Sequence, residues 1–156
     1  MTIKVVVVGK TKEASLRSLE RSYLERLSRY IKVHRLVVRE VKSPKGQKAS
    51  RALEEEARAI LRKIGAGDFC IVLDNQGTEM TSPELADFLQ RHLLSAKVRL
   101  AFVIGGPLGL ADGVRKRANL LLSFSRFTFT HEMIRVLLLE QLYRAWTLIR
   151  GEKYHK

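Results

Sequence analysis

Several features of secreted and membrane-spanning proteins are absent from this sequence. Its 156 residues include one cysteine, Cys70, so no disulfide can form within the chain. No apolar run approaches the roughly 20 residues that a membrane-spanning helix needs, and the first apolar run is too short for a signal peptide because Gly9 ends it. We therefore expect the protein to work in the reducing cytoplasm, with no membrane partner.

Residues that break regular structure are also scarce. The chain has 10 glycines and 3 prolines, and 46% of its residues are hydrophobic, a composition that argues against disorder and against a long linker. A length of 156 residues is usual for one domain. We predict a single domain over residues 1–156.

Acidic residues are too few to balance the basic ones. Sixteen Asp and Glu stand against twenty-nine Lys and Arg, which leaves a formal charge of +13. Such an excess on a small domain favours a polyanionic partner. Nucleic acid is a better candidate than a membrane surface, since no segment has the pattern of a basic amphipathic anchor. A basic protein without an anionic target is the plainer alternative.

Familiar cofactor signatures are missing as well. The first apolar run is not followed by G-x-G-x-x-G, so a nicotinamide or flavin enzyme has no support, and the turn at 9–11 lacks the upstream glycine of a phosphate-binding P-loop. Four separated histidines and one cysteine do not make a zinc site, so we expect no metal. Asp74 and Glu79 are simpler to explain as loop acids than as a catalytic carboxylate pair.

Apolar residues recur alternately at strand-like and helix-like spacing. Compact apolar runs predict strands at 3–8, 35–41, 69–73, 98–104 and 121–124. Amphipathic periodicity predicts helices at about 16–27, 53–64, 82–94, 112–118 and 131–150, with Ser15 and Ser82 as two of the N-caps. The expected fold class is α/β, a mainly parallel sheet with helices on both faces. Ligands of such sheets bind at the carboxyl ends of strands, here after Leu73, Ile104 and Phe124.

Three glycines and a proline directly follow the fourth predicted strand. The segment Gly105-Gly106-Pro107-Leu108-Gly109 lets a backbone of fixed shape approach a ligand closely, so its amides and carbonyls could bind an adenosine. A tight turn between strand and helix explains the same residues equally well. The motif alone leaves both possibilities open.

The last predicted helix has more apolar surface than one small sheet can cover. Leu138, Leu142, Trp146 and Ile149 share one face, which favours a homodimer. Cations, imidazoles and aromatic rings also gather on and beyond this helix, a mixture suited to phosphates and a stacked base. They are His131, Arg135, Arg144, Arg150, Lys153, Tyr154, His155 and Lys156. A frayed basic tail is the plainer explanation of the last four.

Several motifs at matching spacing resemble the ribosomal RNA large subunit methyltransferase H family, and the resemblance covers essentially the whole chain. They are the segments 104–110, 124–136, 140–146 and 151–156. The resemblance implies an α/β knot of the SPOUT class, in which the C-terminal segment passes through a loop. It also implies a homodimer that uses S-adenosylmethionine to methylate N3 of a pseudouridine in 23S ribosomal RNA of the assembled ribosome.

The resemblance assigns cofactor binding to particular positions. They are Leu73, Gly105, Phe124, Ser125, Arg126, Phe127, Thr128 and Phe129. Apolar side chains of Leu73, Ile104, Leu110 and Phe127 would then hold the adenosine. Leu108 and Arg126 depart from some relatives, and we expect the Arg126 side chain to point away from the adenosine.

Methyl transfer from a sulfonium depends mainly on positioning, but N3 must also lose a proton. The candidates for the base are His155, Arg135 and His131, and Tyr154 would stack on or orient the pseudouridine. RNA phosphates would be held by Arg144, Lys153, Lys156, Arg115, Lys116 and Arg117. We expect the tail of one subunit to lie over the site of the other. A non-catalytic ribosome-binding module and a different nucleotide-using enzyme are the alternatives.

Overall fold

Five parallel strands form one sheet at the centre of the molecule. The computed structural model describes residues 2–42, 48–94 and 99–154. The strands are β1 Thr2–Val8, β2 Lys32–Val38, β3 Asp68–Glu79, β4 Arg99–Ile104 and β5 Leu120–Ser123. They lie in the order β2-β1-β4-β3-β5, and each neighbouring pair is parallel. The predicted α/β class with a mainly parallel sheet is confirmed.

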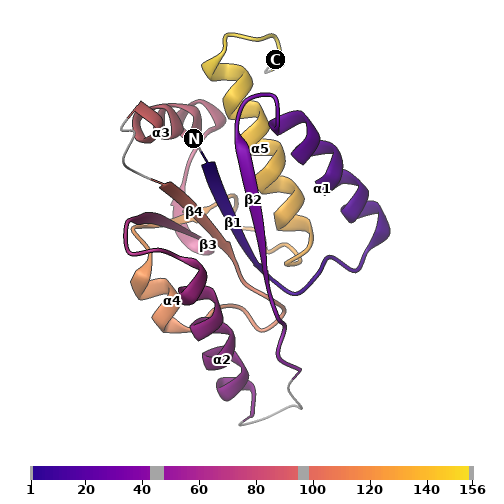
Figure 1. Ribbon diagram of the computed structural model, residues 1–156, viewed down its shortest axis with the longest axis vertical. Helices are drawn as coiled ribbons and strands as arrows, with labels where there is room; N and C mark the ends of the chain where they lie inside the picture. The colour runs from indigo at the N-terminus through magenta and orange to yellow at the C-terminus, as the bar shows by residue number, and fades with distance from the viewer. Residues whose placement is uncertain (1, 43–47, 95–98, 155–156) are drawn as a thin grey trace.

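Helices cover both faces of this sheet (Figure 1). They are α1 Ala14–Leu27, α2 Lys48–Lys63, α3 Ser82–Leu94, α4 Asp112–Arg117 and α5 Met133–Ile149. On one face α1, α3 and α5 share an apolar core with Phe102, and on the other α2 and α4 pack over Val6 and Val103. β1 and β4 contribute to both cores, which explains why these two strands are apolar along most of their length.

The second strand begins and ends three residues earlier than the predicted 35–41. β2 is an edge strand, and its residues pair one to one with β1, from Thr2 with Lys32 to Val8 with Val38. Beyond Val38 the chain leaves the sheet, and the N–H of Val41 donates to the Glu56 carboxylate at 2.8 Å. The prediction was wrong here because the apolar residues of this segment continue past the point where its neighbour β1 ends.

The third strand continues six residues beyond the predicted end at Leu73. Its register against β5 shifts between Leu73 and Thr78, so β5 pairs with residues on both sides of an irregularity. A Cβ on Gly77 would lie 2.6 Å from the backbone of Leu121, so this close crossing requires glycine. The predicted first residue of the fourth strand, Val98, lies outside the described residues.

Two predicted helix caps are wrong. Just before α1, the N–H groups of Lys12 and Glu13 donate to the carboxylate of Glu132 at 2.9 and 3.0 Å, while Ser15 lies inside the helix. α3 is preceded by a capping box one residue earlier than predicted, in which the N–H and hydroxyl of Thr81 donate to Glu84 at 2.7 and 2.8 Å. The first cap is supplied from far along the chain, where local sequence gives no sign of it.

Candidate active site at the carboxyl edge of the sheet

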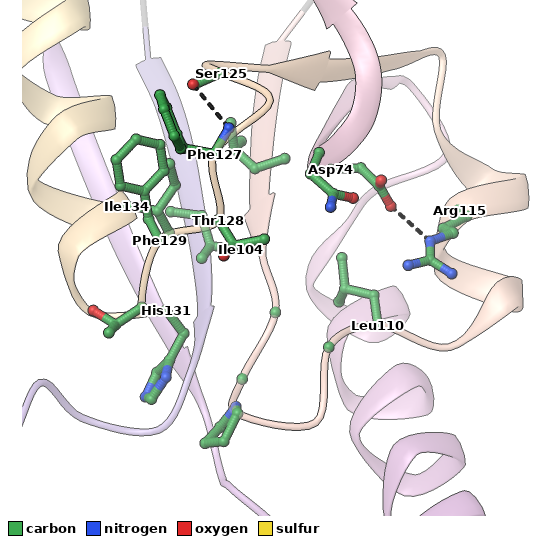
Figure 2. Close-up of a pocket in the computed structure, with 17 residues that line it drawn as sticks. Asp74, Ile104, Leu110, Arg115, Ser125, Phe127, Thr128, Phe129, His131 and Ile134 are labelled. Carbon is green, nitrogen blue, oxygen red and sulfur yellow. Dashed lines mark hydrogen bonds and ion pairs between the residues drawn. The ribbon is translucent and has the colours of Figure 1, made fainter.

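A cavity of about 500 Å³ is lined by the middle of β3, at residues 73–75, and by the carboxyl end of β4 (Figure 2). Its lining comes from three segments, 73–75, 104–110 without Leu108, and 125–131 without Arg126, together with Arg115 and Ile134. This is the edge of the sheet that the parallel fold predicted for a ligand. The sequence drew attention to all three segments, but it gave no role to Asn75, Thr130 or Ile134.

The glycine loop forms one wall of the cavity and has a fixed shape. The N–H of Gly109 donates to the carbonyl of Gly106 at 3.0 Å, and Gly109 has a φ of +83°, which favours glycine. A Cβ on Gly105 would lie 2.7 Å from the Gly109 carbonyl oxygen and 2.9 Å from the Leu110 side chain. Any larger residue at 105 would therefore push the two arms of the loop apart.

The segment 125–131 forms the facing wall. Ser125 is held by two hydrogen bonds: its carbonyl accepts from the Ser123 hydroxyl and its hydroxyl accepts from the N–H of Phe127, each at 3.0 Å. Phe127 and Phe129 both line the cavity, although the Phe127 side chain is 81% exposed. Figure 2 shows this wall on one side and Leu110, Asp74 and Arg115 on the other. The cavity is thus open beside a large exposed aromatic ring.

Two of the residues assigned to the cofactor lie away from this cavity. Phe124 lines a separate apolar hollow of about 350 Å³, together with Leu85, Leu137 and part of Phe129. The Arg126 side chain is 96% exposed and lies 3.9 Å from Glu79, so it points away from the cavity as expected. Leu73, Gly105, Ser125, Phe127, Thr128 and Phe129 do line it. Neighbouring residues of an extended wall face opposite sides, which a motif match does not distinguish.

His131 is the histidine that the structure brings to the cavity. Burial, followed by the positive charge of Arg135, lowers the pKa of His131 below its ordinary value, while Glu132 and Glu40 oppose this shift. The neutral imidazole is therefore favoured at neutral pH. A neutral imidazole with a free lone pair has the form that a proton acceptor requires.

Arg135, a predicted catalytic residue, is buried instead, with 2% of its surface exposed. Its guanidinium donates to the carbonyls of Val8 at 2.5 Å and Gly9 at 3.1 Å and to the Thr11 hydroxyl at 3.0 Å. Arg135 therefore fastens the carboxyl end of β1 to the start of α5. It does not contribute to the lining of the cavity.

Asp74 and Arg115 form an ion pair in the cavity wall that the sequence did not indicate. Arg115 Nε donates to Asp74 Oδ2 at 2.7 Å, and the Asp74 side chain is 5% exposed. Burial works against ionisation of Asp74, but hydrogen bonds from the Gln76 N–H and Arg115 outweigh it and hold its pKa below the usual range. Asp74 lies inside β3, directly after its apolar residues, and this first charge after an apolar run was the available signal in the sequence.

The other cations predicted to bind RNA are partly engaged within the chain. Arg117 donates to the carbonyls of Gly65 and Asp68 at 3.1 Å each. Arg144 lies 2.7 Å from Glu140, one helical turn before it. Lys116 is exposed. The predicted cluster 115–117 thus has three different environments: Arg115 is in an ion pair, Lys116 is exposed, and Arg117 makes half-buried contacts with carbonyls.

The C-terminal tail lies far from the cavity of its own chain. α5 has 17 residues, so at 1.5 Å per residue its end is about 25 Å from its start beside His131. Beyond that end the chain turns back along the helix, so that Tyr154 packs against Tyr143 at 4.8 Å between ring centroids, with Arg144 4.9 Å over its ring. Burial and a hydrogen bond with Tyr23 raise the pKa of Tyr154 to about 12. Lys153 is exposed, and His155 and Lys156 lie outside the described residues.

Two kinds of feature are absent from the described part of the chain. Across residues 2–42, 48–94 and 99–154, no three His, Cys, Asp or Glu side chains gather as a metal site would need. In that part of the chain no helix is long and apolar enough to cross a bilayer.

Comparison with known proteins shows which class the chain belongs to. The model of a family described as predicted SPOUT methyltransferase matches residues 1–155, so the chain is a SPOUT methyltransferase by class. It is 42% identical over 154 residues to a protein of Caldicellulosiruptor saccharolyticus and 37% identical over 155 residues to one of Christiangramia forsetii, covering 99% of each chain. Both are named ribosomal RNA large subunit methyltransferase H. The chain belongs to that family.

Two solved structures share the fold at low sequence identity. A probable methylase family protein from Haemophilus influenzae has a TM-score of 0.56 and 15% identity, covering 99% of this chain and 70% of that one. A probable methyltransferase from Bordetella pertussis has a TM-score of 0.58 and 12% identity, covering 93% of each chain. These likenesses support the fold and carry nothing about substrate.

Proposed function

We propose that this chain transfers a methyl group from S-adenosylmethionine to N3 of a pseudouridine in 23S ribosomal RNA of the assembled ribosome, as a cytoplasmic homodimer. The observation that carries the proposal is the cavity beside the glycine loop, in a chain whose relatives are named ribosomal RNA methyltransferases. The formal charge of +13 is suited to an RNA substrate.

The cavity has the size and lining that the cofactor needs. Its volume of about 500 Å³ lies within the range of roughly 300–1,000 Å³ for small-molecule sites. Leu73, Ile104, Leu110 and Ile134 offer apolar surface to an adenosine. The tightly closed loop at Gly105 offers backbone N–H and carbonyl groups at fixed positions. S-Adenosylmethionine supplies an electrophilic methyl group when it is bound.

The residues of this chain contribute position and proton transfer. The two walls hold the reacting centres in line, which is the larger part of catalysis for such a transfer. His131, neutral and at the cavity edge, accepts the N3 proton of the pseudouridine. Arg135 acts indirectly, because its contacts with Val8 and Gly9 fix the strand end on which the wall rests.

The second copy of the chain completes the site in this proposal. Within one chain Tyr154 packs against Tyr143 in the second half of α5, about 15 Å along the helix axis from its start beside His131. A two-fold related copy can present its own tail to the cavity without breaking the contacts that hold Tyr154 on α5. Tyr154 and His155 would then face the pseudouridine, with Arg144, Lys153 and Lys156 near its phosphates.

The α/β knot of the SPOUT class is also part of the proposal. α5 packs against both α1 and α3, and β5 lies at the edge of the sheet beside β3, which is compatible with a C-terminal segment that passes through a loop. Pulling the chain from its two ends tests this point. A knotted chain stops short of its full extended length, and an unknotted one reaches it.

Calorimetric titration tests the proposal and its alternatives. We expect S-adenosylmethionine to bind without added metal and ATP to bind far more weakly. Gly105→Val should weaken cofactor binding at least tenfold, about 1.4 kcal/mol, because the new side chain meets Gly109 and Leu110. Gly67→Val is the matched control, since no atom lies within 4 Å of its added Cβ.

Three outcomes contradict the proposal. Binding of ATP in preference to S-adenosylmethionine would indicate a different nucleotide-using enzyme. Ribosome binding without any cofactor binding would indicate a non-catalytic module. Equal cofactor affinity of Gly105→Val and Gly67→Val would show that the glycine loop is not part of the site.

A further inference from the structure

Four exposed cations lie on the two loops that follow β1 and β2. They are Lys10 and Lys12 after β1, and Arg39 and Lys42 after β2. Two carboxylates, Glu13 and Glu40, lie among them, so the positive charges are in excess. The sequence drew attention to Lys10 alone, in the turn at 9–11 that lacks the upstream glycine of a P-loop. We call the four residues the basic rim.

The two loops are joined to each other. The N–H of Gly9 donates to the carbonyl of Val38 at 2.7 Å, which holds the ends of β1 and β2 together. A Cβ on Gly9 would lie 2.9 Å from a carboxylate oxygen of Glu40, so the second loop passes directly over the first. The basic rim is therefore one surface.

The basic rim borders the cavity on two sides. Next to the cavity residue His131, Glu132 accepts the N–H of Lys12 at 2.9 Å. On the other side, one oxygen of Glu56 accepts the N–H of Val41 at 2.8 Å, and its second oxygen lies 3.8 Å from the Cβ position of Gly106 in the glycine loop. Figure 1 shows the loops after β1, β2 and β4 at the same end of the sheet.

The charges of the basic rim are available to a partner. Lys12 Nζ lies 3.4 Å from Glu40, but its side chain is 73% exposed, and exposed pairs of this kind contribute little, so an anion can replace Glu40. For Lys10, Arg39 and Lys42 there is no side-chain partner within the described part of the chain. By contrast, Arg115, Arg117 and Arg144 already contact acceptors of the same chain.

We propose that the basic rim holds the phosphates of the RNA strand next to the nucleotide that enters the cavity. A base that leaves its stack to enter a site brings its own flanking phosphates to the edge of that site. Four exposed cations along the edge neutralise those phosphates without base-specific contacts. This inference rests on the proposed function and adds the surface on which its substrate is oriented.

The test compares two double charge reversals of equal size. Lys10→Glu with Lys12→Glu alters the basic rim. Arg62→Glu with Lys63→Glu alters two exposed cations at the end of α2, which leads to the amino end of β3. For each variant, cofactor affinity is measured by calorimetry, and kcat and KM for ribosomal substrate by methyl incorporation over a range of salt concentrations.

We expect the variant of the basic rim to raise KM for the ribosomal substrate at least tenfold, with cofactor affinity within about twofold of the parent. The slope of log KM against log salt should fall by about 1.4, because each lost phosphate contact on a single strand contributes about 0.7. The α2 variant should change KM less than threefold.

An equal rise of KM in both variants would overturn the inference, since net charge alone would then explain binding. So would an unchanged KM in the Lys10 and Lys12 variant, or a loss of cofactor affinity in place of substrate affinity. A parent protein that neither binds S-adenosylmethionine nor methylates RNA would refute the proposed function itself, which is a separate result.

Discussion

At the amino ends of the strands a buried carboxylate has its partners, whereas at the carboxyl ends a buried guanidinium lacks one. Asp68 accepts from Lys4 at 2.6 Å, Arg99 at 2.9 Å and the N–H of Gly65 at 2.7 Å. Arg135 makes three contacts, but among the described residues its Nε has no acceptor. An unsatisfied buried polar atom costs about 1–3 kcal/mol, so Arg135 stabilises the fold less than a fully paired guanidinium would.

The two ends of the sheet also differ in how much surface they leave open. The carboxyl end carries the cavity, the tight glycine loop and the exposed Phe127, all of which leave surface open to a ligand. The amino end closes on itself through Asp68 and through Arg117, which donates to the carbonyls of Gly65 and Asp68. The amino end of the sheet is thus closed by contacts that stabilise the fold. The carboxyl end leaves surface exposed for a ligand and is stabilised less.

The largest expected effect comes from the tail, which in its own subunit lies at the amino end. Deleting Tyr154 to Lys156 should lower ribosome methylation by orders of magnitude and leave S-adenosylmethionine affinity within about threefold. The physical reason is that the proposed function places the tail against the pseudouridine and not against the adenosine. Methyl incorporation and calorimetry measure the two quantities separately.

Mixing two inactive variants shows which subunit uses the tail. Tail-deleted subunits and Gly105→Val subunits, exchanged at equal amounts, should regain about a quarter of the parent activity, because each mixed dimer has one complete site. Near-normal turnover of the tail-deleted protein alone would reduce the tail to an electrostatic tether. Absence of any recovery would place the tail over the cavity of its own chain.

Replacing Arg135 should damage both stability and binding. Arg135→Met leaves the carbonyls of Val8 and Gly9 without their donor, which should lower the free energy of unfolding by about 3 kcal/mol. Cofactor affinity should fall as well, since a Cβ at Gly106 would lie only 2.9 Å from Val8 and the strand end supports the loop. Urea unfolding and calorimetry test the pair of effects, and a stable variant with parental affinity would contradict both.

Asp68→Asn should affect stability alone and by a smaller amount. Losing the carboxylate between Lys4 and Arg99 should lower the free energy of unfolding by about 1–2 kcal/mol, with cofactor affinity unchanged within about twofold. Loss of cofactor affinity in this variant would contradict the view that the amino end of the sheet affects stability and not cofactor binding.

The effect of Asp68 should also depend on pH. Burial raises the pKa of Asp68, but Lys4, the Gly65 N–H and Arg99 outweigh it, so the folded pKa lies below the ordinary 3.8. A depressed carboxyl pKa stabilises the fold above pH 3.8, and the stabilisation is lost as pH falls below that value toward the folded pKa. The difference in unfolding free energy between parent and Asp68→Asn should therefore shrink in acid and stay constant near neutrality.

Elements with a strong local cause were predictable from the sequence. β1 and β4 are buried on both faces and appear as apolar runs, and the glycine loop follows β4 directly. β2 was displaced because its extent is set by β1, and the cap of α1 was missed because Glu132 lies 120 residues from Lys12. The bounds of an element that depend on a distant segment cannot be predicted from the residues of the element itself.

The candidate site was predictable by segment and not by side chain. Leu73, Gly105 and Phe127 reach the cavity, whereas Phe124 faces another hollow and Arg135 turns into the core. A cation four residues after a histidine looks like part of a catalytic group when only composition is visible. The Arg135 side chain points into the core because it donates to the carbonyls of Val8 and Gly9, which no local pattern predicts.

The contact from Glu132 to the N–H groups of Lys12 and Glu13 has a consequence for the order of folding. It joins positions separated by 120 and 119 residues, so a chain leaving the ribosome completes α1 long before the cap of that helix exists. The closing of so large a loop is entropically costly and comes late. The first helix therefore lacks its cap until the segment around Glu132 has been made, and we expect a fragment that ends before Glu132 to hold neither the capped helix nor a finished cavity.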